Sequence, residues 1–288
     1  MGFVQVGSES GWRTANTVSF RNTAKELGIT LKFLEPTAKQ PIQENDFREF
    51  VANEEVNVIV LDALRTANWE DELMEARATG KIVIVEDRPI DASEDLYAAF
   101  IGSDFEEQGR KAGRAMVELL KNSHVKNILE LAGTEGSQAA EDRARGFREA
   151  IQGSGIVITQ TRVGNFYRPE GKQVMQVLLE GRTDEQAVFV HNDDMALGAI
   201  EAIRQAGLRP GVDIKIVSID GTRGALSVIL AGELNVTVEC SPLYAPLVYE
   251  AALKAMNGEQ VPKRIMVEGE VFSSDTPNLE EITENRLY

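Results

Sequence analysis

The sequence has little of the chemistry that metal sites and disulfides need. Its 288 residues contain one cysteine and two histidines, His124 and His191. One cysteine can form neither an internal disulfide nor a cysteine zinc site, and two histidines so far apart argue against a histidine metal site. We therefore expect no metal ion and no other cofactor.

Basic residues are outnumbered. The chain has 30 Lys and Arg against 46 Asp and Glu, which gives a formal net charge of −16. Binding to a phosphate backbone requires a basic surface, so we expect no nucleic-acid partner. A large net charge of one sign also suits a protein that stays a monomer in solution.

Long apolar runs are absent as well, since no run approaches the ~18–20 residues of a transmembrane helix. No basic segment followed by an apolar stretch precedes the first expected strand, so the sequence shows no signal peptide. Two alternatives stay open at this point. The chain is either cytosolic or an exported protein whose leader was removed.

What the sequence does contain is a regular alternation of short apolar runs with amphipathic helical stretches. Strands are expected at residues 3–6, 30–34, 56–61, 81–86, 97–102, 127–131, 156–161, 187–190, 214–219 and 235–240. Helices are expected at residues 16–27, 45–53, 70–79, 105–121, 139–152, 169–180, 195–206, 222–231 and 244–257. Apolar strands separated by helices are typical of parallel sheets covered on both faces. We therefore expect an α/β fold with two doubly wound parallel-sheet domains.

No linker rich in Pro, Gly or Ser separates the two α/β halves. Two units joined without a flexible tether suggest that the chain crosses from one to the other, and such crossings make hinges. In open parallel sheets, ligands bind beyond the carboxyl ends of the strands. The sequence therefore predicts a ligand site lined from both domains.

Polar residues follow almost every expected strand. They are carboxylates, amides and arginines, together with two aromatic residues, Trp12 and Phe166. Planar bidentate groups match sugar hydroxyls, which both donate and accept hydrogen bonds, and aromatic rings pack on the apolar face of a sugar. The alternative for each single residue is a helix N-cap or a turn. Their number in both halves favours a sugar site.

Catalytic signatures are missing. The stretch Gly133–Gly136 lacks the Lys-Ser/Thr ending of a phosphate loop, and Gly7–Gly11 has Glu9 at its centre, where a nucleophile elbow has serine. No dinucleotide fingerprint follows the first strand. We therefore expect a binding protein and not an enzyme.

Several motifs carry a family resemblance over nearly the whole chain. They are GSESGWR (7–13), VEDRPID (85–91), IGSDFEEQGRKAG (101–113), EDRARGF (141–147), HNDDMALGAI (191–200), VSIDGTRGA (217–225) and VTVECSP (236–242). With them the chain resembles the periplasmic sugar-binding proteins of ABC importers, in the ribose/galactose-binding branch. It is most similar to the galactofuranose-binding subgroup.

The resemblance implies two α/β domains, joined by three crossovers, that close on a sugar by hinge motion. The implied domains are residues 1–103 plus 240–270 and residues 104–239 plus 271–288. The implied sugar contacts of the first domain are Glu9, Ser10, Trp12, Arg13, Asp62, Asp87 and Arg88. Those of the second domain are Arg143, Phe166, Asn192 and Asp220, with Glu239 at a crossover.

The resemblance further implies the function of the chain. It would capture a monosaccharide, a hexose or pentose and possibly a furanose such as galactofuranose, outside the cytoplasm. It would deliver this sugar to the membrane permease of an ABC importer. The alternative is the effector-binding domain of a LacI-type regulator or sensor that lacks its output module. The basic helix-turn-helix segment that a repressor carries is not seen before the first strand.

The sequence departs from the subgroup's pattern in three segments. It has Gln40-Pro41-Ile42-Gln43 after the second strand and Asp62-Ala63-Leu64-Arg65 after the third, and it carries an acid at Glu135. The added acids at Asp62 and Glu135 leave open a ligand with an amine, or a bound cation. The departures predict a changed rim around an unchanged set of Arg, Asp and aromatic contacts.

Overall fold

A computed structural model describes residues 1–7, 10–34 and 39–288. The chain groups into two compact units. Unit 1 comprises Met1–Ser8, Arg13–Ser103 and Pro242–Val267, and unit 2 comprises Glu9–Trp12, Asp104–Ser241 and Glu268–Tyr288. The chain passes from unit 1 to unit 2 for the last time between Val267 and Glu268, slightly before the implied boundary at residue 270.

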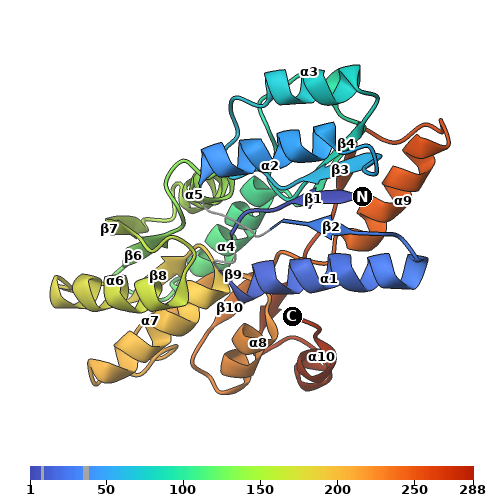
Figure 1. Cartoon of the computed structure of the whole chain (residues 1–288). Coiled ribbons are helices and arrows are strands. Elements are labelled where there is room, and N and C mark those ends of the chain that lie inside the picture. The colour runs from blue at the N-terminus through green and yellow to red at the C-terminus, as the bar shows by residue number, and fades with distance from the viewer. Residues whose placement is uncertain (8–9, 35–38) are drawn as a thin grey trace. The chain divides into compact units, whose positions relative to one another are not determined.

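Unit 1 is built on a six-stranded parallel sheet in the order β11-β5-β4-β3-β1-β2. Its strands are β1 (Gly2–Val4), β2 (Lys32–Phe33), β3 (Val58–Leu61), β4 (Ile82–Glu86), β5 (Ala99–Gly102) and β11 (Arg264–Met266). Its helical segments are α1 (Gly11–Leu27), α2 (Gln40–Ala52), α3 (Glu70–Ala78), η1 (Glu94–Leu96) and α9 (Ala245–Met256). Figure 1 shows α2 and α3 on one face of this sheet and α1 on the other. Both faces are thus covered.

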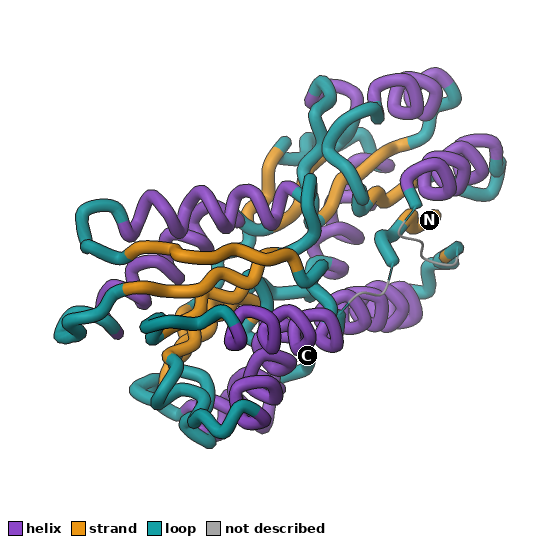
Figure 2. Tube along the Cα trace, turned by 90° about the vertical axis from the view of Figure 1, so that its left-hand side faces the viewer, coloured by secondary structure: helices purple, strands orange, loops and turns teal. Residues whose placement is uncertain are grey.

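Unit 2 repeats the plan, with the strand order β12-β10-β9-β8-β6-β7. Its strands are β6 (Asn127–Ala132), β7 (Val157–Val163), β8 (Ala187–Val190), β9 (Lys215–Asp220), β10 (Val236–Glu239) and β12 (Val271–Ser273). Its helices are α4 (Phe105–Leu119), α5 (Gln138–Ile151), α6 (Arg168–Glu180), α7 (Asp193–Gln205), α8 (Arg223–Leu230) and α10 (Leu279–Asn285). Only β12 pairs antiparallel among the described strands, with β10. Figure 2 shows the strands lying side by side with helices packed along them.

Each sheet buries its apolar side chains under its helices. In unit 1, Phe47, Phe50 and Trp69 pack with the Val and Ile residues of β3 and β4, and all three rings are almost fully buried. In unit 2, the rings of Phe147 and Phe189 stack at 3.9 Å. These cores hold the carboxyl ends of the strands in place. Within the ranges that the structure describes, no helix is both long and apolar enough to cross a membrane.

The ten expected strands and nine expected helices are all present, with ends that differ by a few residues. Strands β11 and β12 and helix α10, all after residue 257, were not expected. Helix α1 begins at Gly11 instead of Asn16, so Trp12 and Arg13 lie in its first turn. A cation in the first turn opposes the helix dipole. Arg13 offsets this cost through its contacts with Asp62 and Asp87.

Candidate functional site

Four of the predicted site residues of unit 1 form one buried charged cluster. Arg13 extends from α1 and places Nη1 2.7 Å from Asp62 Oδ2 and Nη2 2.7 Å from Asp87 Oδ2. Asp62 follows β3 and Asp87 follows β4, so parallel strands bring both carboxylates to one edge of the sheet. Arg88 Nε lies 3.7 Å from Asp87 Oδ2. We call these four residues the unit 1 cluster.

Backbone conformation at the strand ends is strained where the site was predicted. Asp87, Phe166 and Asp220 have φ angles of 57°, 61° and 136°. Such values disfavour residues with a side chain, and they persist only where the surroundings over-determine the backbone. Three of the predicted contacts therefore hold conformations that propensity does not explain. Strain of this kind gathers at ligand sites.

Glu86 is a fully buried acid beside the unit 1 cluster that the sequence analysis did not single out. It is the last residue of β4 and is 0% exposed. Neither carboxyl oxygen has a hydrogen-bond partner within the described part of the chain. Burial, together with the charges of Asp62 and Asp87, raises the pKa of Glu86 well above its usual value, and the charge of Arg13 opposes this shift only in part. The surroundings of Glu86 therefore favour its protonated form.

The raised pKa of Glu86 predicts a particular pH dependence of stability. Because the pKa of Glu86 is higher in the folded state, the folded protein binds more protons than the unfolded chain above about pH 4.5, and stability falls as pH rises. Glu86→Gln removes this loss, and we expect the variant to gain on the wild type with rising pH, by up to about 1.4 kcal/mol per pH unit between the unfolded and the folded pKa. Chemical denaturation of both proteins from about pH 4 to about pH 8 measures it. Taking their difference cancels the titrating groups remote from the unit 1 cluster, and parallel curves for the two proteins would contradict the raised pKa of Glu86.

A second cluster, the unit 2 cluster, forms around Arg143 of α5. Its Nη2 lies 3.4 Å from Asp220 Oδ1, and its Nη1 donates to the backbone carbonyl of His191 at 2.7 Å. Gln108 of α4 accepts from both Nε and Nη2 at 3.1 Å. The guanidinium also lies over the rings of Phe105 and Phe166, at 5.3 and 5.9 Å from their centroids. Arg143 is only 4% exposed, so its position is fixed from several sides.

Phe166 is seated against the loop after β6. A Cβ on Gly133 would lie 2.0 Å from the Phe166 ring, so only glycine leaves room for the ring there. Asn192 Nδ2 donates to the backbone carbonyl of Phe166 at 3.2 Å. Its Oδ1 caps α7 by accepting from Met195 N at 3.1 Å. Asn192 therefore serves as the N-cap that was the alternative interpretation, and it also fixes Phe166.

His191 lies behind this cluster and is neutral. Gly133 N donates to Nδ1 at 3.2 Å, so the proton of the ring is on Nε2, which lies 3.2 Å from Glu130 Oε1. Burial lowers the pKa of His191. Burial alone would raise the pKa of Glu130, but hydrogen bonds from His191 and Arg148 outweigh it and lower this pKa to about 2. His191 thus positions the Gly133 loop and is no proton-transfer group.

The turn that carries Asp220 is held from inside by a buried carboxylate. Asp193 is 0% exposed and accepts from Ser218 Oγ at 2.5 Å and Thr237 Oγ1 at 2.7 Å. Thr222 N and Oγ1 donate to its other oxygen at 2.7 and 3.0 Å. The pKa of Asp220 is raised by burial, while Arg143 opposes the shift. Asp193 was not predicted as a site residue, although it stands inside the HNDDMALGAI motif.

The carboxylate of Glu239, predicted as a sugar contact, is engaged with residues near the C-terminal end of the chain. Its Oε1 accepts from Arg286 Nη1 at 2.7 Å and from Tyr288 Oη at 2.8 Å. Its Oε2 accepts from Glu270 N at 3.0 Å. Arg286 and Tyr288 lie about fifty residues after Glu239, and no sequence pattern links the two segments. We therefore leave Glu239 out of the sugar contacts proposed below.

The remaining predicted residues stand near the start of α1. Glu9 lies outside the described residues. Ser10 directly precedes α1 and is partly buried. Trp12 is 5% exposed, and its indole N–H donates to the backbone carbonyl of Cys240 at 2.5 Å, a contact within unit 2. The ring of Trp12 is therefore anchored at its polar end.

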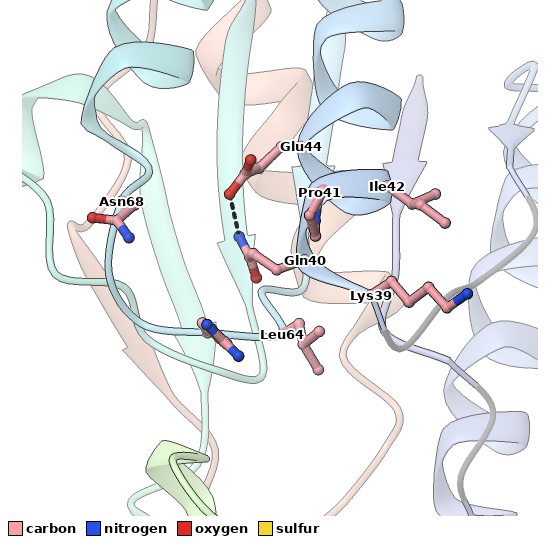
Figure 3. Close-up of a pocket in the computed structure, with 8 residues that line it drawn as sticks. Lys39, Gln40, Pro41, Ile42, Glu44, Leu64 and Asn68 are labelled. Atoms are coloured by element: carbon pink, nitrogen blue, oxygen red, sulfur yellow. Dashed lines mark hydrogen bonds between the residues drawn. The ribbon is translucent and has the colours of Figure 1, made fainter.

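A pocket in unit 1 is lined by residues from two of the segments that depart from the subgroup's pattern, 40–43 and 62–65. Its lining residues are Lys39, Gln40, Pro41, Ile42, Glu44, Leu64, Arg65 and Asn68. Figure 3 shows these side chains around the loop after β3 and the start of α2, with Gln40 donating to Glu44 at 3.0 Å. Gln43 ties the two segments together, because it donates to Asp62 O and accepts from Leu64 N, both at 2.8 Å. These two departing segments thus contact each other at the edge of the sheet.

Both clusters are suited to binding. Each combines carboxylates and arginines that are already paired, and neither contains a serine, cysteine or histidine placed as a nucleophile or base. Across residues 1–7, 10–34 and 39–288, no group of three or more His, Cys, Asp or Glu side chains is arranged to hold a metal ion.

A protein-family model, described as a periplasmic binding protein domain, matches residues 1–260 of the chain. The chain belongs to this family. The family resemblance and the expected α/β fold are thereby confirmed, and so is the prediction of a binding protein that is not an enzyme. Among periplasmic binding proteins, the galactofuranose-binding protein YtfQ of Escherichia coli strain K12 is 36% identical over 282 residues, which cover 96% of this chain and 88% of YtfQ.

Solved structures of periplasmic binding proteins agree with this placement. A protein from Mycobacterium smegmatis in complex with β-D-fucofuranose has a TM-score of 0.94 and 39% identity, and the match covers 99% of this chain and 93% of that one. The binding protein of the arabinose ABC transporter from Shewanella sp. ANA-3, bound to α- and β-L-arabinofuranose, has a TM-score of 0.91 and 38% identity. That match covers 99% of this chain and 94% of the Shewanella protein.

Proposed function

We propose that this protein binds a monosaccharide in its furanose form and is the solute-binding component of an ABC importer, working in the periplasm or outside the membrane. The observation that carries the proposal is the pair of buried strand-end clusters, each with an arginine held against carboxylates. The names of the relatives supply the sugar class, since galactofuranose, fucofuranose and arabinofuranose all occur among them.

The proposed contacts are Ser10, Trp12, Arg13, Asp62, Asp87 and Arg88 together with Arg143, Phe166, Asn192 and Asp220. We propose that residues of both clusters bind the same sugar molecule. Fixed, desolvated arginines and carboxylates recognise a pattern of hydroxyl groups, and a sugar that leaves one of them unpaired loses about 1–3 kcal/mol per group. Phe166 offers an apolar face for the C–H side of the ring.

A ligand panel tests the sugar and its ring size together. D-galactose, L-arabinose and D-fucose are titrated by calorimetry as free sugars, beside methyl furanosides and methyl pyranosides whose ring size is locked. We expect binding of the free sugars with an affinity limited by their furanose fraction, and no binding of the pyranosides. Tight binding of a pyranoside alone would overturn the furanose assignment, and no binding or thermal shift with any free sugar would overturn the sugar class.

Arg88→Ala tests the unit 1 cluster directly. Asp87 keeps its bond to Arg13 in this variant, so the fold should tolerate the change. A hydrogen bond from a charged side chain to a sugar hydroxyl is worth about 1.5–3 kcal/mol, and we expect the Kd for the best free sugar to rise at least roughly 10-fold when Arg88 is removed. Calorimetry beside a melting curve measures both quantities. Unchanged affinity would remove Arg88 from the site.

A further inference from the structure

The turn formed by Asp220 and Gly221 is clamped from outside by a segment that no sequence motif marks. Arg286 Nε donates to the carbonyl of Gly221 at 2.7 Å, and Arg223 N donates to the carbonyl of Tyr288 at 2.5 Å. The clamp therefore grips both sides of the turn through its backbone. All of these residues belong to unit 2.

Glu239 closes the clamp. Its carboxylate holds Arg286 Nη1 at 2.7 Å and Tyr288 Oη at 2.8 Å. Burial and the charge of Glu239 raise the pKa of Tyr288, so its phenol keeps the proton that it donates. The Arg286 guanidinium also lies over the rings of Phe272 and Tyr288, at 4.8 and 4.6 Å from their centroids. Arg286, Tyr288 and Glu239 are thus fixed as one group, which we call the outer clamp.

The turn requires such a clamp because its backbone is strained. Asp220 has φ of 136° and Gly221 has φ of 73°. A non-glycine residue in this region costs on the order of 1–3 kcal/mol, and the surrounding contacts must over-determine it. A Cβ on Gly221 would lie 2.8 Å from Arg286 Nη2, so the clamp packs directly on the turn. Relaxation of the turn would move the Asp220 carboxylate away from Arg143.

We propose that Arg286, Tyr288 and Glu239 are positioning residues for ligand binding, because they hold the Asp220 turn in the conformation that presents its carboxylate beside Arg143. This inference rests on the proposed function, in which Asp220 and Arg143 contact the sugar. The clamp itself does not touch the sugar. Glu239 thereby acts through the turn and not as a direct contact.

Arg286→Met tests the clamp while keeping the length of the side chain. Calorimetry with D-galactose and L-arabinose, both as free sugars, is run well below the melting temperature of each variant. We expect the Kd for both sugars to rise about tenfold, the size of effect that residues without ligand contact can exert. The matched control is Arg204→Met, which removes an exposed arginine from its pair with Glu233 on the same unit and should leave the Kd unchanged.

The variant Glu239→Gln, alone and combined with Arg286→Met, distinguishes a positioning role of Glu239 from a direct contact with the sugar. If Glu239 acts only through the clamp, adding Glu239→Gln to Arg286→Met leaves the Kd at the value of the single variant. Additive losses would show a direct sugar contact and overturn the assignment of Glu239. A lower melting temperature with an unchanged Kd for Arg286→Met would overturn the whole inference. A wild-type protein that binds neither sugar would instead count against the proposed function.

Discussion

Replacing Arg13 by Met is expected to abolish sugar binding and to lower the free energy of unfolding by about 3–5 kcal/mol. Arg13 is 2% exposed and bonds Asp62 and Asp87 at 2.7 Å each. Removing it leaves two buried carboxylates beside the buried Glu86, with Arg88 as the nearby cation. Breaking a buried pair is far more costly than never forming it, because the remaining charge stays desolvated.

The same change leaves the first turn of α1 with fewer contacts. This turn has no acidic residue, and without Arg13 it still has the hydrogen bonds from Gly11 N to Asp194 Oδ2 at 2.6 Å and from the Trp12 indole to Cys240 O at 2.5 Å, but it loses both contacts to the unit 1 carboxylates. We therefore expect loss of binding and loss of stability to appear together in calorimetry and denaturant titration. The variant Arg13→Met with Asp62→Asn should recover part of the stability, because one uncompensated charge is gone, but should not recover binding.

Arg77→Met is the matched control in the same unit. Its pair with Asp95 is 3.1 Å long, and both side chains are more than half exposed. Exposed pairs contribute about 0–1 kcal/mol, so this variant should bind and unfold nearly as the wild type does. If Arg13→Met lost no more stability than Arg77→Met, the unit 1 cluster would not be a buried charge network.

Replacing Asp193 by Ala is expected to destabilise the protein by about 3–5 kcal/mol and to weaken sugar binding with it. Four donors from Ser218, Thr222 and Thr237 converge on this carboxylate. Each buried donor that loses its acceptor costs about 1–3 kcal/mol, less where it finds another partner. Thr237 Oγ1 also accepts from Gly221 N at 3.1 Å, so loss of Asp193 loosens the Asp220 turn from inside.

Asp104→Ala is the comparison that isolates burial. Asp104 caps α4 by accepting one hydrogen bond from Glu107 N at 2.8 Å, and it is exposed. Loss of such a cap costs about 1 kcal/mol and should not change the Kd. The loss of stability for Asp193→Asn should fall between those of Asp193→Ala and Asp104→Ala. The amide keeps one acceptor oxygen, but its NH2 group faces donors that need an acceptor. Equal losses for Asp193→Ala and Asp104→Ala would contradict the four-donor network.

Much of the fold was accessible from the sequence for a simple reason. Buried parallel strands need continuous apolar runs, and helices that cover a sheet need amphipathic repeats, so both leave periodic patterns over many residues. The carboxyl-end rule placed Asp62, Asp87 and Asp220 at strand ends, and the family resemblance implied these three together with Arg13 and Arg143 as sugar contacts. The structure brings them together as two clusters, although contact with a sugar stays a prediction for each of them.

Other features left no such pattern. Glu86 and Asp87 are adjacent acids in the sequence, and only the packing shows that Glu86 is buried with a raised pKa while Asp87 is paired with Arg13. Asn192 stays a predicted sugar contact, and only the structure shows that its side-chain oxygen also caps the N-terminus of α7. Glu239 lies at the carboxyl end of β10, as expected for a site residue. Its hydrogen-bond partners are Glu270, which directly precedes β12, and Arg286 and Tyr288.

The sequence by itself determined the alternation of strands and helices, the family, and the residue types at the strand ends, because these depend on local pattern and on fold topology. Only the tertiary structure decided which of those residues are paired, which are neutral and which hold a strained turn. Ionisation and hydrogen bonding depend on desolvation and on partners far away in the chain. Hence the sequence named Asp220, and the fold showed that Asp193 and Arg286 keep it in place.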